Sequence, residues 1–309
     1  RSGGVWDTDG TWSTDFGDGD DVINNFAGGT ILLDDSGIYL GGSVAGNTFV
    51  NAGTIKARGE ILVHMGTGLS APANPLPLHN IGIIDFLDDH TDDSLTIVGD
   101  LGGNGNVNID LDLSGLASDQ LYVEGNMVNG AAQRVNVDFN GMPLTAHASV
   151  AFAHVSGTSS AGSFVAGQMI GYNEPANFLD LDLTVSSQLN AANTADDVFR
   201  INLDVVGLND TGTLAANVAS GAAGMLNAQV GTFKQRMGVN PYGDAGKVMS
   251  AFFRTYTSEG DVNPDHVAAN FGQGGNYGYD QSVWGREVGV NANLFGNFHA
   301  GLTFGSADG

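Results

Sequence analysis

The sequence of 309 residues contains no cysteine, which excludes a disulfide scaffold, thiol catalysis and zinc bound by cysteine. Basic residues are also scarce, with 10 Lys and Arg against 34 Asp and Glu, and the formal charge is −24. Nucleic acids and anionic lipid headgroups are bound through clustered Lys and Arg, so neither is an expected partner. No apolar run approaches the roughly 18 residues of a membrane-spanning helix.

Glycine is abundant, with 47 residues, whereas charged residues make up only 14% of the chain. An ordinary domain has about 25% charged residues. Here Asn, Ser, Thr, Gly and Asp supply the polarity instead, and these residues favour turns over helix interiors. Because 42% of the residues are hydrophobic, the chain can still build a core, and the composition predicts an all-β protein with many short strands.

A degenerate repeat occupies the first hundred residues. Three segments share an Asn, then a Gly, then a β-branched pair: residues 23–31, 49–55 and 78–84. Their aligned glycines lie 24 and 29 residues apart: Gly29, Gly53 and Gly82. Repeats of about 20–50 residues are typical of solenoids, in which each coil buries its apolar face against the next.

The repeat therefore predicts a right-handed parallel β-solenoid, or β-helix, over roughly residues 10–200, with Ile31, Ile55 and Ile84 stacked in its interior. A sandwich of similar strands is the alternative. Between residues 94 and 206 apolar residues alternate with Asp or Asn, which indicates strands with one wet face. In the clearest strand the apolar residues are Val107, Ile109, Leu111 and Leu113, and the residues expected on the wet face are Asn106, Asn108, Asp110 and Asp112.

Residues 213–238 have a helical pattern instead. Apolar residues recur every three or four positions: Leu214, Val218, Ala222, Leu226, Val230, Phe233 and Met237. Asp210–Thr213 offers N-cap residues, and Gly238 with Pro241 offers a stop. We expect one long helix here, with its apolar stripe facing protein rather than water.

Strands return after residue 246 in a different style. Trp284, Val288, Val290, Ala292 and Leu294 share one face of a strand, and Gly285, Glu287, Gly289, Asn291 and Asn293 share the other. The segment 298–305 repeats this alternation, and 247–256 would be the preceding strand. Strands of about ten residues with an apolar face and a glycine or polar face are typical of transmembrane barrels. Arg286 falls on the apolar face, so either it lies near the membrane interface or the expected strand register fails there.

The order of these parts resembles the bacterial autotransporters of type V secretion. Residues 80–86 and 94–106 look like final passenger coils, and residues 108–114 with 118–125 look like the strand pair of the family's autochaperone region. The helix and the hairpin of residues 284–304 look like the linker and the early barrel. The resemblance covers nearly the whole chain, and its order is more specific than any one motif.

This resemblance implies four parts: solenoid passenger coils (1–93), an autochaperone-like end of the solenoid (94–207), a linker helix (208–242) and the start of a β-barrel (243–309). It implies a non-enzymatic chain at the outer membrane and cell surface, with an extracellular passenger in an adhesion or virulence role. Its partners would be the barrel-assembly machinery and an extracellular target. We expect a monomer. We also expect an internal piece of a longer protein, because a barrel of this family has about a dozen strands and only about three can be counted here.

Two other readings remain open. One is a stand-alone solenoid adhesin or surface-layer protein whose last strands form no barrel. The other is the non-catalytic end of a polysaccharide-degrading β-helix enzyme with its active site before Arg1. Paired carboxylates suit glycoside hydrolysis. Asp residues alternate along many strands here, however, so almost any pair could be chosen and the sequence indicates no particular one. The seven histidines lack metal-ligand spacing, and no Gly-x-Ser-x-Gly motif is present.

One segment offers calcium ligands. Phe16–Asn24 matches most of the nine-residue Ca²⁺-binding repeat, and Asp18, Asp20 and Asp21 would supply the carboxylates. Such a site needs adjacent coils to complete the oxygen cage, and a single copy is present, so an acidic turn is the alternative. Asp88–Asp89 with Asp92–Asp93 forms a second acidic loop, with a metal site and a solvated turn as its two interpretations. No other cofactor is expected.

Overall fold

A computed structural model describes residues 5–7, 14–17, 21–40, 47–66, 78–128, 130–140, 146–171, 178–190, 195–215, 217–218, 221–224, 226, 249–262, 279–295 and 298–308. The chain divides into two compact units, which are considered separately below. The first unit comprises residues 1–173 and 181–205, and the second comprises residues 174–180 and 206–309.

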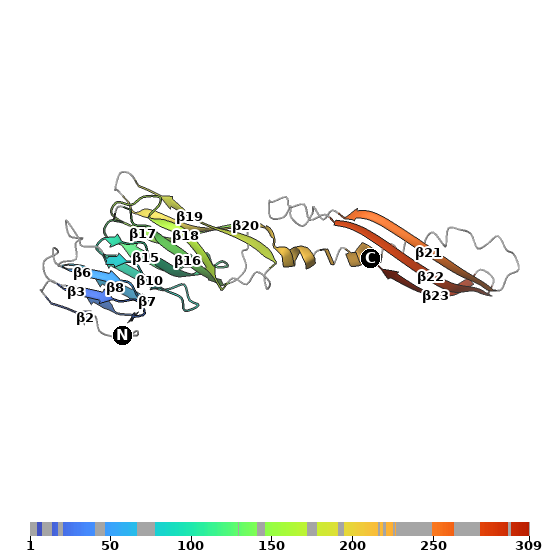
Figure 1. Cartoon of the computed structure of the whole chain (residues 1–309), viewed down its shortest axis with the longest axis horizontal. Coiled ribbons are helices and arrows are strands. Elements are labelled where there is room, and N and C mark those ends of the chain that lie inside the picture. The colour runs from blue at the N-terminus through green and yellow to red at the C-terminus, as the bar shows by residue number, and fades with distance from the viewer. Residues whose placement is uncertain are drawn as a thin grey trace. The chain divides into compact units, whose positions relative to one another are not determined.

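The first unit is built from three sheets that the chain visits in turn (Figure 1). The first sheet contains β1 (Val5–Asp7), β4 (Thr30–Asp34), β7 (Thr54–Arg58), β10 (Ile83–Asp85), β13 (Asn106–Asp112), β16 (Gln133–Asn140) and β18 (Phe164–Ile170). The second contains β2 (Thr14–Asp15), β5 (Gly37–Tyr39), β8 (Glu60–His64), β11 (Ser94–Val98), β15 (Gln120–Val123), β17 (His147–Val155), β20 (Asp197–Leu208) and β19 (Leu179–Gln188). The third contains β3 (Val22–Asn25), β6 (Thr48–Asn51), β9 (Leu78–Asn80) and β12 (Leu101–Gly102). The short β14 (Ala117–Ser118) pairs with β13.

Each strand from β1 to β16 pairs in parallel with the strand one coil further along, except β12, which ends the third sheet, and the short β14. The result is a parallel β-solenoid of about five turns. The predicted parallel β-solenoid is confirmed and the sandwich alternative is wrong, whereas the right-handed winding stays a prediction. Equivalent residues of successive coils stack at the strand spacing, so no coil can bury its inner face without its neighbours.

The core consists of columns of aliphatic side chains, one residue per coil. In the first sheet one column joins five buried residues in register: Ile31, Ile55, Ile84, Val107 and Val135. The predicted stacking of the three isoleucines is therefore confirmed. The second sheet contributes a matching column of Ile38, Val63, Ile97, Val123 and Val155. Burying each such side chain stabilises the fold by roughly 1.5–3 kcal/mol.

The asparagines of the repeat form a buried ladder at the corner between the third and first sheets. Asn25 Nδ2 donates to Asn51 Oδ1 at 2.7 Å, and Asn51 Nδ2 donates to Asn80 Oδ1 at 2.8 Å. An amide carries both donors and acceptors, so a stack of them satisfies itself without water. The next coil has Gly103 in place of an asparagine. Gln133 fills the gap, because its Oε1 accepts from Asn80 Nδ2 at 2.7 Å.

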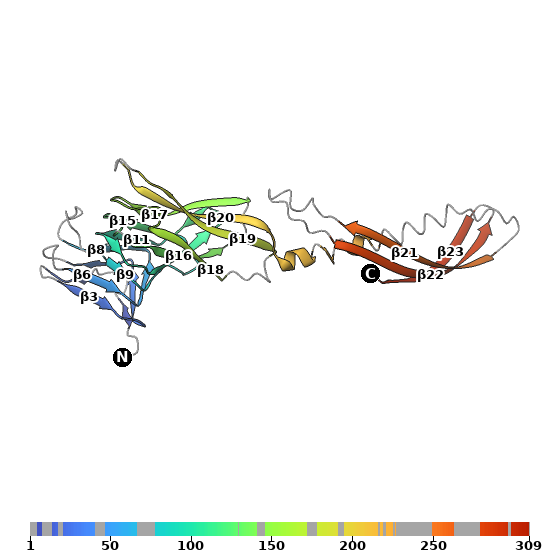
Figure 2. The ribbon, with the colours of Figure 1, turned by 45° about the horizontal axis from the view of Figure 1, so that its top comes forward.

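The solenoid ends by changing strand direction rather than by continuing to wind. Strand β20 pairs with β17 in antiparallel register, as Figure 2 shows. The expectation of solenoid coils up to about residue 200 is wrong in this respect. Three buried aromatic rings fill the interior here: Phe164 packs against Phe152 and Phe199, with ring centroids 5.4 and 4.7 Å apart.

The second unit contains helical residues after β20 and a three-stranded antiparallel sheet. The helical residues are 210–215, 217–218, 221–224 and 226. The sheet contains β21 (Met249–Val262), β22 (Tyr279–Phe295) and β23 (Phe298–Asp308), in that order. The expected N-cap among Asp210–Thr213 is wrong. Asn209 serves instead, because its side-chain oxygen accepts the Gly212 N–H at 2.9 Å.

Candidate functional site

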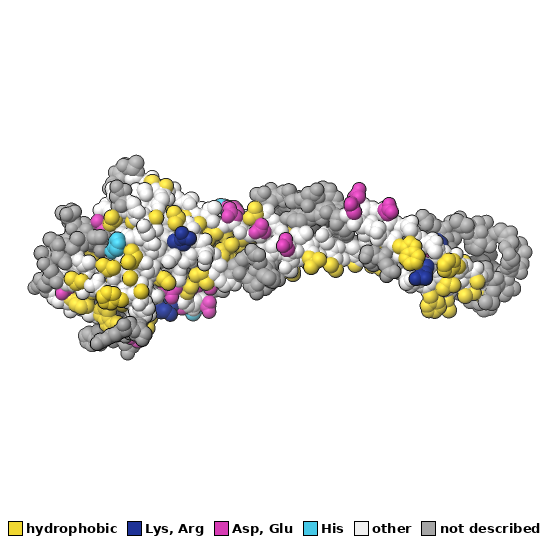
Figure 3. All heavy atoms as spheres, viewed as in Figure 1, with side chains coloured by type: hydrophobic (Ala, Val, Ile, Leu, Met, Phe, Trp, Pro, Cys, Tyr) yellow, Lys and Arg dark blue, Asp and Glu magenta, His cyan; other side chains and the backbone are white. Residues whose placement is uncertain are grey.

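The C-terminal sheet exposes large apolar side chains along one face. Phe253 lies opposite Val288, and Val288 lies opposite Phe304, so these three form a row across β21, β22 and β23. Phe253 and Phe304 are 70% and 71% exposed. Leu302, which lies opposite Val290, is 71% exposed. In the space-filling view of Figure 3, hydrophobic side chains gather over these strands. The expected alternation of faces in β22 is thus present.

The opposite face of the same sheet is lined by glycine, aromatic and charged residues. A Cβ at Gly285 would lie 2.3 Å from the Tyr256 ring, and a Cβ at Gly289 would lie 2.4 Å from the Phe252 ring. Only glycine therefore allows these rings to lie across β22. Arg254 and Glu287 are mostly buried on this face, with Nη2 and Oε2 3.9 Å apart. In a sheet that packs its apolar face inward, the polar face is exposed; here the apolar face is exposed instead.

The helical residues lie against this glycine-rich face. The side chain of Gln281 donates from Nε2 to the Gly221 carbonyl at 3.1 Å. A Cβ at Gly224 would lie 2.2 Å from Gln281 Oε1, so the small residues of the helix allow a close approach. The expectation that the apolar stripe faces protein is wrong for the described residues. Leu214, Val218 and Leu226 are each 64% exposed, whereas Gly221 and Gly224 are the helical residues in contact with Gln281.

Arg286 lies on the apolar face, and the structure explains how a charge is tolerated there. Its neighbours across the strands are the polar residues Thr255 and Ser306, so it lies next to the apolar row of Val288 rather than within it. Its guanidinium carbon is 5.1 Å from the centroid of the Trp284 ring, a cation–π arrangement. The expected strand register holds at this position.

Of the three candidate calcium ligands, the structure describes one. Asp18 and Asp20 lie outside the described residues. Asp21 is described, and its backbone N–H donates to Asn47 Oδ1 at 2.9 Å. Within the described ranges no group of three or more His, Asp or Glu side chains is placed to hold a metal ion. The described part also contains no helix long and apolar enough to cross a membrane.

In the second acidic loop Asp88, Asp89 and Asp92 are exposed, as in a solvated turn, whereas Asp93 is buried in a carboxylate cluster with Asp110 and Asp119. Asp119 accepts the Asp110 N–H at 2.8 Å and the Asp93 N–H at 3.3 Å. Asp93 in turn accepts the Gly59 N–H at 2.5 Å, so hydrogen bonds to these carboxylates link three successive coils. Burial raises the pKa of Asp119 to about 8 and the pKa of Asp93 to about 6. Arg58 lies beside the cluster, with Nη1 4.0 Å from Asp93 Oδ2.

Asp110, expected on a wet face, is 1% exposed. Its Oδ2 accepts the N–H groups of Asp88 and Asp89 at 2.7 and 3.0 Å, so the loop folds over it. Burial raises its pKa, while these two hydrogen bonds oppose the rise. Sequence reasoning missed this cluster. One sequence feature could have indicated it. Asp93 and Asp119 each come directly before a strand that starts with a polar residue and then an apolar one.

Comparison of the chain with models of protein families, with curated proteins and with solved structures finds no match.

Proposed function

We propose that the chain is part of a bacterial autotransporter, in which a β-solenoid passenger is held at the cell surface by a membrane-embedded sheet. The carrying observation is the reversed polarity of β21–β23, which expose phenylalanine and leucine and turn glycine and an ion pair toward the helix. In water this face costs free energy, whereas in hydrocarbon it is the favourable arrangement.

The helix fits the linker role of that family. A helix within a pore must lie against the lumen face of the strands, and Gly221 and Gly224 lie against that face of β22. The exposed stripe of Leu214, Val218 and Leu226 would then face further strands of a complete barrel. Three strands leave open edges, which hydrocarbon does not tolerate, so the proposal requires more strands than β21–β23.

Single-cysteine scanning tests the membrane part, because the chain has no cysteine of its own. Phe253→Cys, Val288→Cys and Phe304→Cys would each be labelled with a fluorophore in outer-membrane preparations. We expect lipid-borne nitroxides to quench these labels strongly. Phe26→Cys is the matched control, since Phe26 is an equally apolar residue that is 76% exposed on the solenoid. Its label should respond to water-soluble quenchers instead.

If labels at Phe253 and Phe304 respond to aqueous quenchers as the Phe26 label does, the membrane assignment is wrong. A stand-alone surface solenoid would then be the better account. Binding of the isolated sheet to detergent alone would not rescue the proposal, because any exposed apolar face binds detergent.

The autochaperone role of residues 94–207 is a separate part of the proposal. Leu111 is 1% exposed on β13, so Leu111→Ala removes core contacts near the C-terminal end of the solenoid. If this end is the template, the variant slows refolding of residues 10–90, whereas Ile31→Ala leaves folding of residues 94–207 intact. Refolding rates of a 1–207 fragment measure both. Equal folding of the N-terminal coils with and without Leu111 would exclude the template role.

A further inference from the structure

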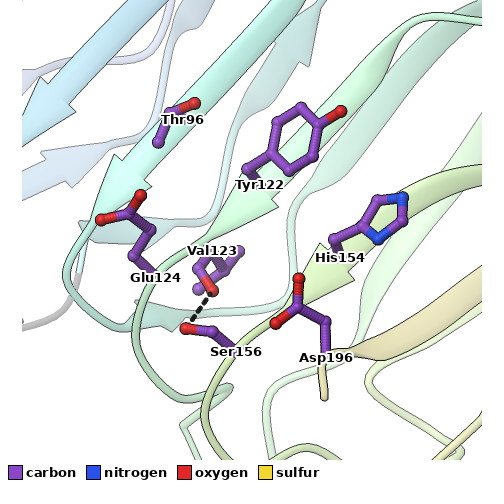
Figure 4. A pocket seen from close by; sticks show the side chains of 7 residues that line it. All are labelled: Thr96, Tyr122, Val123, Glu124, His154, Ser156 and Asp196. Atoms are coloured by element: carbon purple, nitrogen blue, oxygen red, sulfur yellow. Dashed lines mark hydrogen bonds between the residues drawn. The ribbon is translucent and has the colours of Figure 1, made fainter.

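The outer face of the second sheet carries a cavity of about 520 Å³. Three of its lining residues lie side by side in register on adjacent strands: Thr96 on β11, Tyr122 on β15 and His154 on β17. Figure 4 shows these side chains around the cavity together with Glu124, Ser156 and Asp196. The volume lies within the range of about 300–1,000 Å³ that small-molecule sites occupy.

The cavity has one aromatic wall. The rings of Tyr122 and His154 are stacked, with centroids 5.3 Å apart and planes 19° apart. Tyr122 is 36% exposed, so part of its ring remains open to solvent. A tyrosine ring held in place on a strand offers an apolar surface at low entropic cost.

The remaining walls are polar, and their hydrogen-bonding capacity is largely unused. Glu124 and Ser156 follow the ends of β15 and β17, and Asp196 precedes β20, so three turns bring them to one edge. Ser156 Oγ donates a long bond of 3.4 Å to the Val123 carbonyl. Among the described residues, the side chains of Thr96, Glu124 and Asp196 make no hydrogen bond or ion pair.

The charge of the lining selects among ligands. Two carboxylates and no Lys or Arg line the cavity, so phosphate, sulfate and acidic sugars are repelled. A metal ion is disfavoured as well, because no three His, Asp or Glu side chains of the described residues are placed to hold one. Carboxylates accept hydrogen bonds from hydroxyl groups, and these charge-assisted bonds are about twice as strong as neutral ones.

From these features we infer that the cavity binds a neutral pyranose unit of a glycan. The C–H face of the sugar lies on the Tyr122 ring, and its hydroxyls donate to Glu124 and Asp196. The site faces outward on the solenoid, where a polysaccharide can reach it. This inference does not depend on the membrane proposal, since every residue that it uses belongs to the first unit.

Saturation-transfer NMR on the full chain tests the inference, in a detergent without a sugar headgroup. The probes are the methyl pyranosides of glucose, galactose, mannose and N-acetylglucosamine, with glucuronate as the anionic comparison. We expect at least one neutral glycoside to bind and glucuronate to bind at least tenfold more weakly. Tyr122→Ala should weaken binding by roughly tenfold. Glu124→Gln and Asp196→Asn should each weaken it severalfold.

Tyr39→Ala is the matched control. Tyr39 stacks on His64 on the same sheet, with centroids 5.9 Å apart, but lies outside the cavity. The control should leave glycoside binding unchanged, and circular dichroism should show that all variants are folded. Equal losses in Tyr39→Ala and Tyr122→Ala would overturn the inference. So would preferential binding of glucuronate or Ca²⁺, or the absence of any glycoside binding by the folded chain at millimolar concentrations.

Discussion

Strands β13 and β22 share one sequence pattern but differ in where the apolar face points. In β13 the alternate residues Val107, Ile109 and Leu111 are buried inside the solenoid. In β22 Val288 and Val290, also two residues apart, are 52% and 43% exposed. Alternation therefore specifies which residues share a face, and the surroundings decide whether that face meets protein or something else.

The difference arises from what covers each strand. Each inner coil of the solenoid has a neighbour above and below, and strands of other sheets lie across the core. Strand β22 has two strand neighbours and the helical residues, and these residues lie on its polar face. The first arrangement is closed to water by the chain itself. In the second, the apolar face is left uncovered by the described residues, which is the basis of the membrane proposal.

The largest expected effect is the loss of a buried apolar side chain in the solenoid, compared with the loss of an exposed one in the C-terminal sheet. Ile55→Ala removes a fully buried side chain from the centre of a column and should lower the free energy of unfolding by about 2–5 kcal/mol. Leu302→Ala should change it by less than about 0.5 kcal/mol, because that side chain is already exposed. Urea unfolding of the full chain measures both. A similar loss in the two variants would show that the exposed face is packed in solution.

The second prediction concerns the buried amide ladder. Asn51→Ala leaves Asn25 Nδ2 without its Asn51 partner and Asn80 Oδ1 without a donor, and each loss costs about 1–3 kcal/mol. A matched change is Asn108→Ala on the outer face of the first sheet, where Asn108 Nδ2 donates to Asp85 Oδ1 at 2.9 Å. Water can replace that bond, so we expect a loss below about 1 kcal/mol. Thermal unfolding measures both losses of stability. A larger loss in Asn108→Ala than in Asn51→Ala would contradict the ladder's role.

The third prediction is a dependence of solenoid stability on pH. A carboxyl whose pKa is raised in the folded state keeps its proton where the unfolded chain has lost it. Stability is therefore complete below the unfolded pKa of about 4 and falls as pH rises through about 6 for Asp93 and about 8 for Asp119. We expect the free energy of unfolding to fall by about 1–2 kcal/mol between pH 6 and pH 8.

Two variants separate this effect from the general repulsion among acidic residues. Asp119→Asn cannot release a proton, so its stability should depend less on pH between 6 and 8. Asp112→Asn is the control in the same coil, because hydrogen bonds from the Ser114 side chain and from two backbone N–H groups lower the pKa of Asp112. Its stability should depend on pH in that range as the unmodified chain does. Chemical unfolding at several pH values measures the slopes, and identical slopes in all three chains would rule out Asp119 as the source.

The smallest expected effect concerns Arg286. Arg286→Leu removes a charge from the apolar face together with its contact to Trp284, which is worth about 0.5–1 kcal/mol at an exposed site. In membranes the loss of the charge should offset that contact, so partition into the membrane should stay equal or increase slightly. Val288→Arg, one row further along the same face, should reduce it. Flotation of the chain with lipid vesicles compares the two, and a loss in Arg286→Leu as large as in Val288→Arg would contradict the expected offset.

Much of the solenoid could be predicted from the repeat because stacking makes each coil resemble its neighbours in sequence. The spacing of Asn, Gly and a β-branched pair predicted the isoleucine column. The asparagines of the same repeat form the ladder of Asn25, Asn51 and Asn80, which was not predicted. Gln133 was not predictable from that spacing. It reaches the ladder only because the preceding coil has a glycine at the asparagine position.

The buried carboxylates and the cavity were missed for a different reason. Asp93, Asp110 and Asp119 come from separate turns, and Tyr122 meets His154 only because β15 and β17 lie in one register. Each of these residues looks like an ordinary turn or surface residue along the chain. Their contacts cross coils of unequal length, and no local pattern records which positions end up in the same row.

Taken alone, the sequence determined that the chain forms strands, where coils repeat, and which side chains share a face, because these follow from local periodicity and glycine placement. The tertiary structure decided which face is buried, that Leu214 and Val218 are exposed, and that Asp110 lies inside. It decided these points because burial depends on what packs against a strand. That is a property of neighbours 20 or more residues away along the chain, which local alternation does not encode.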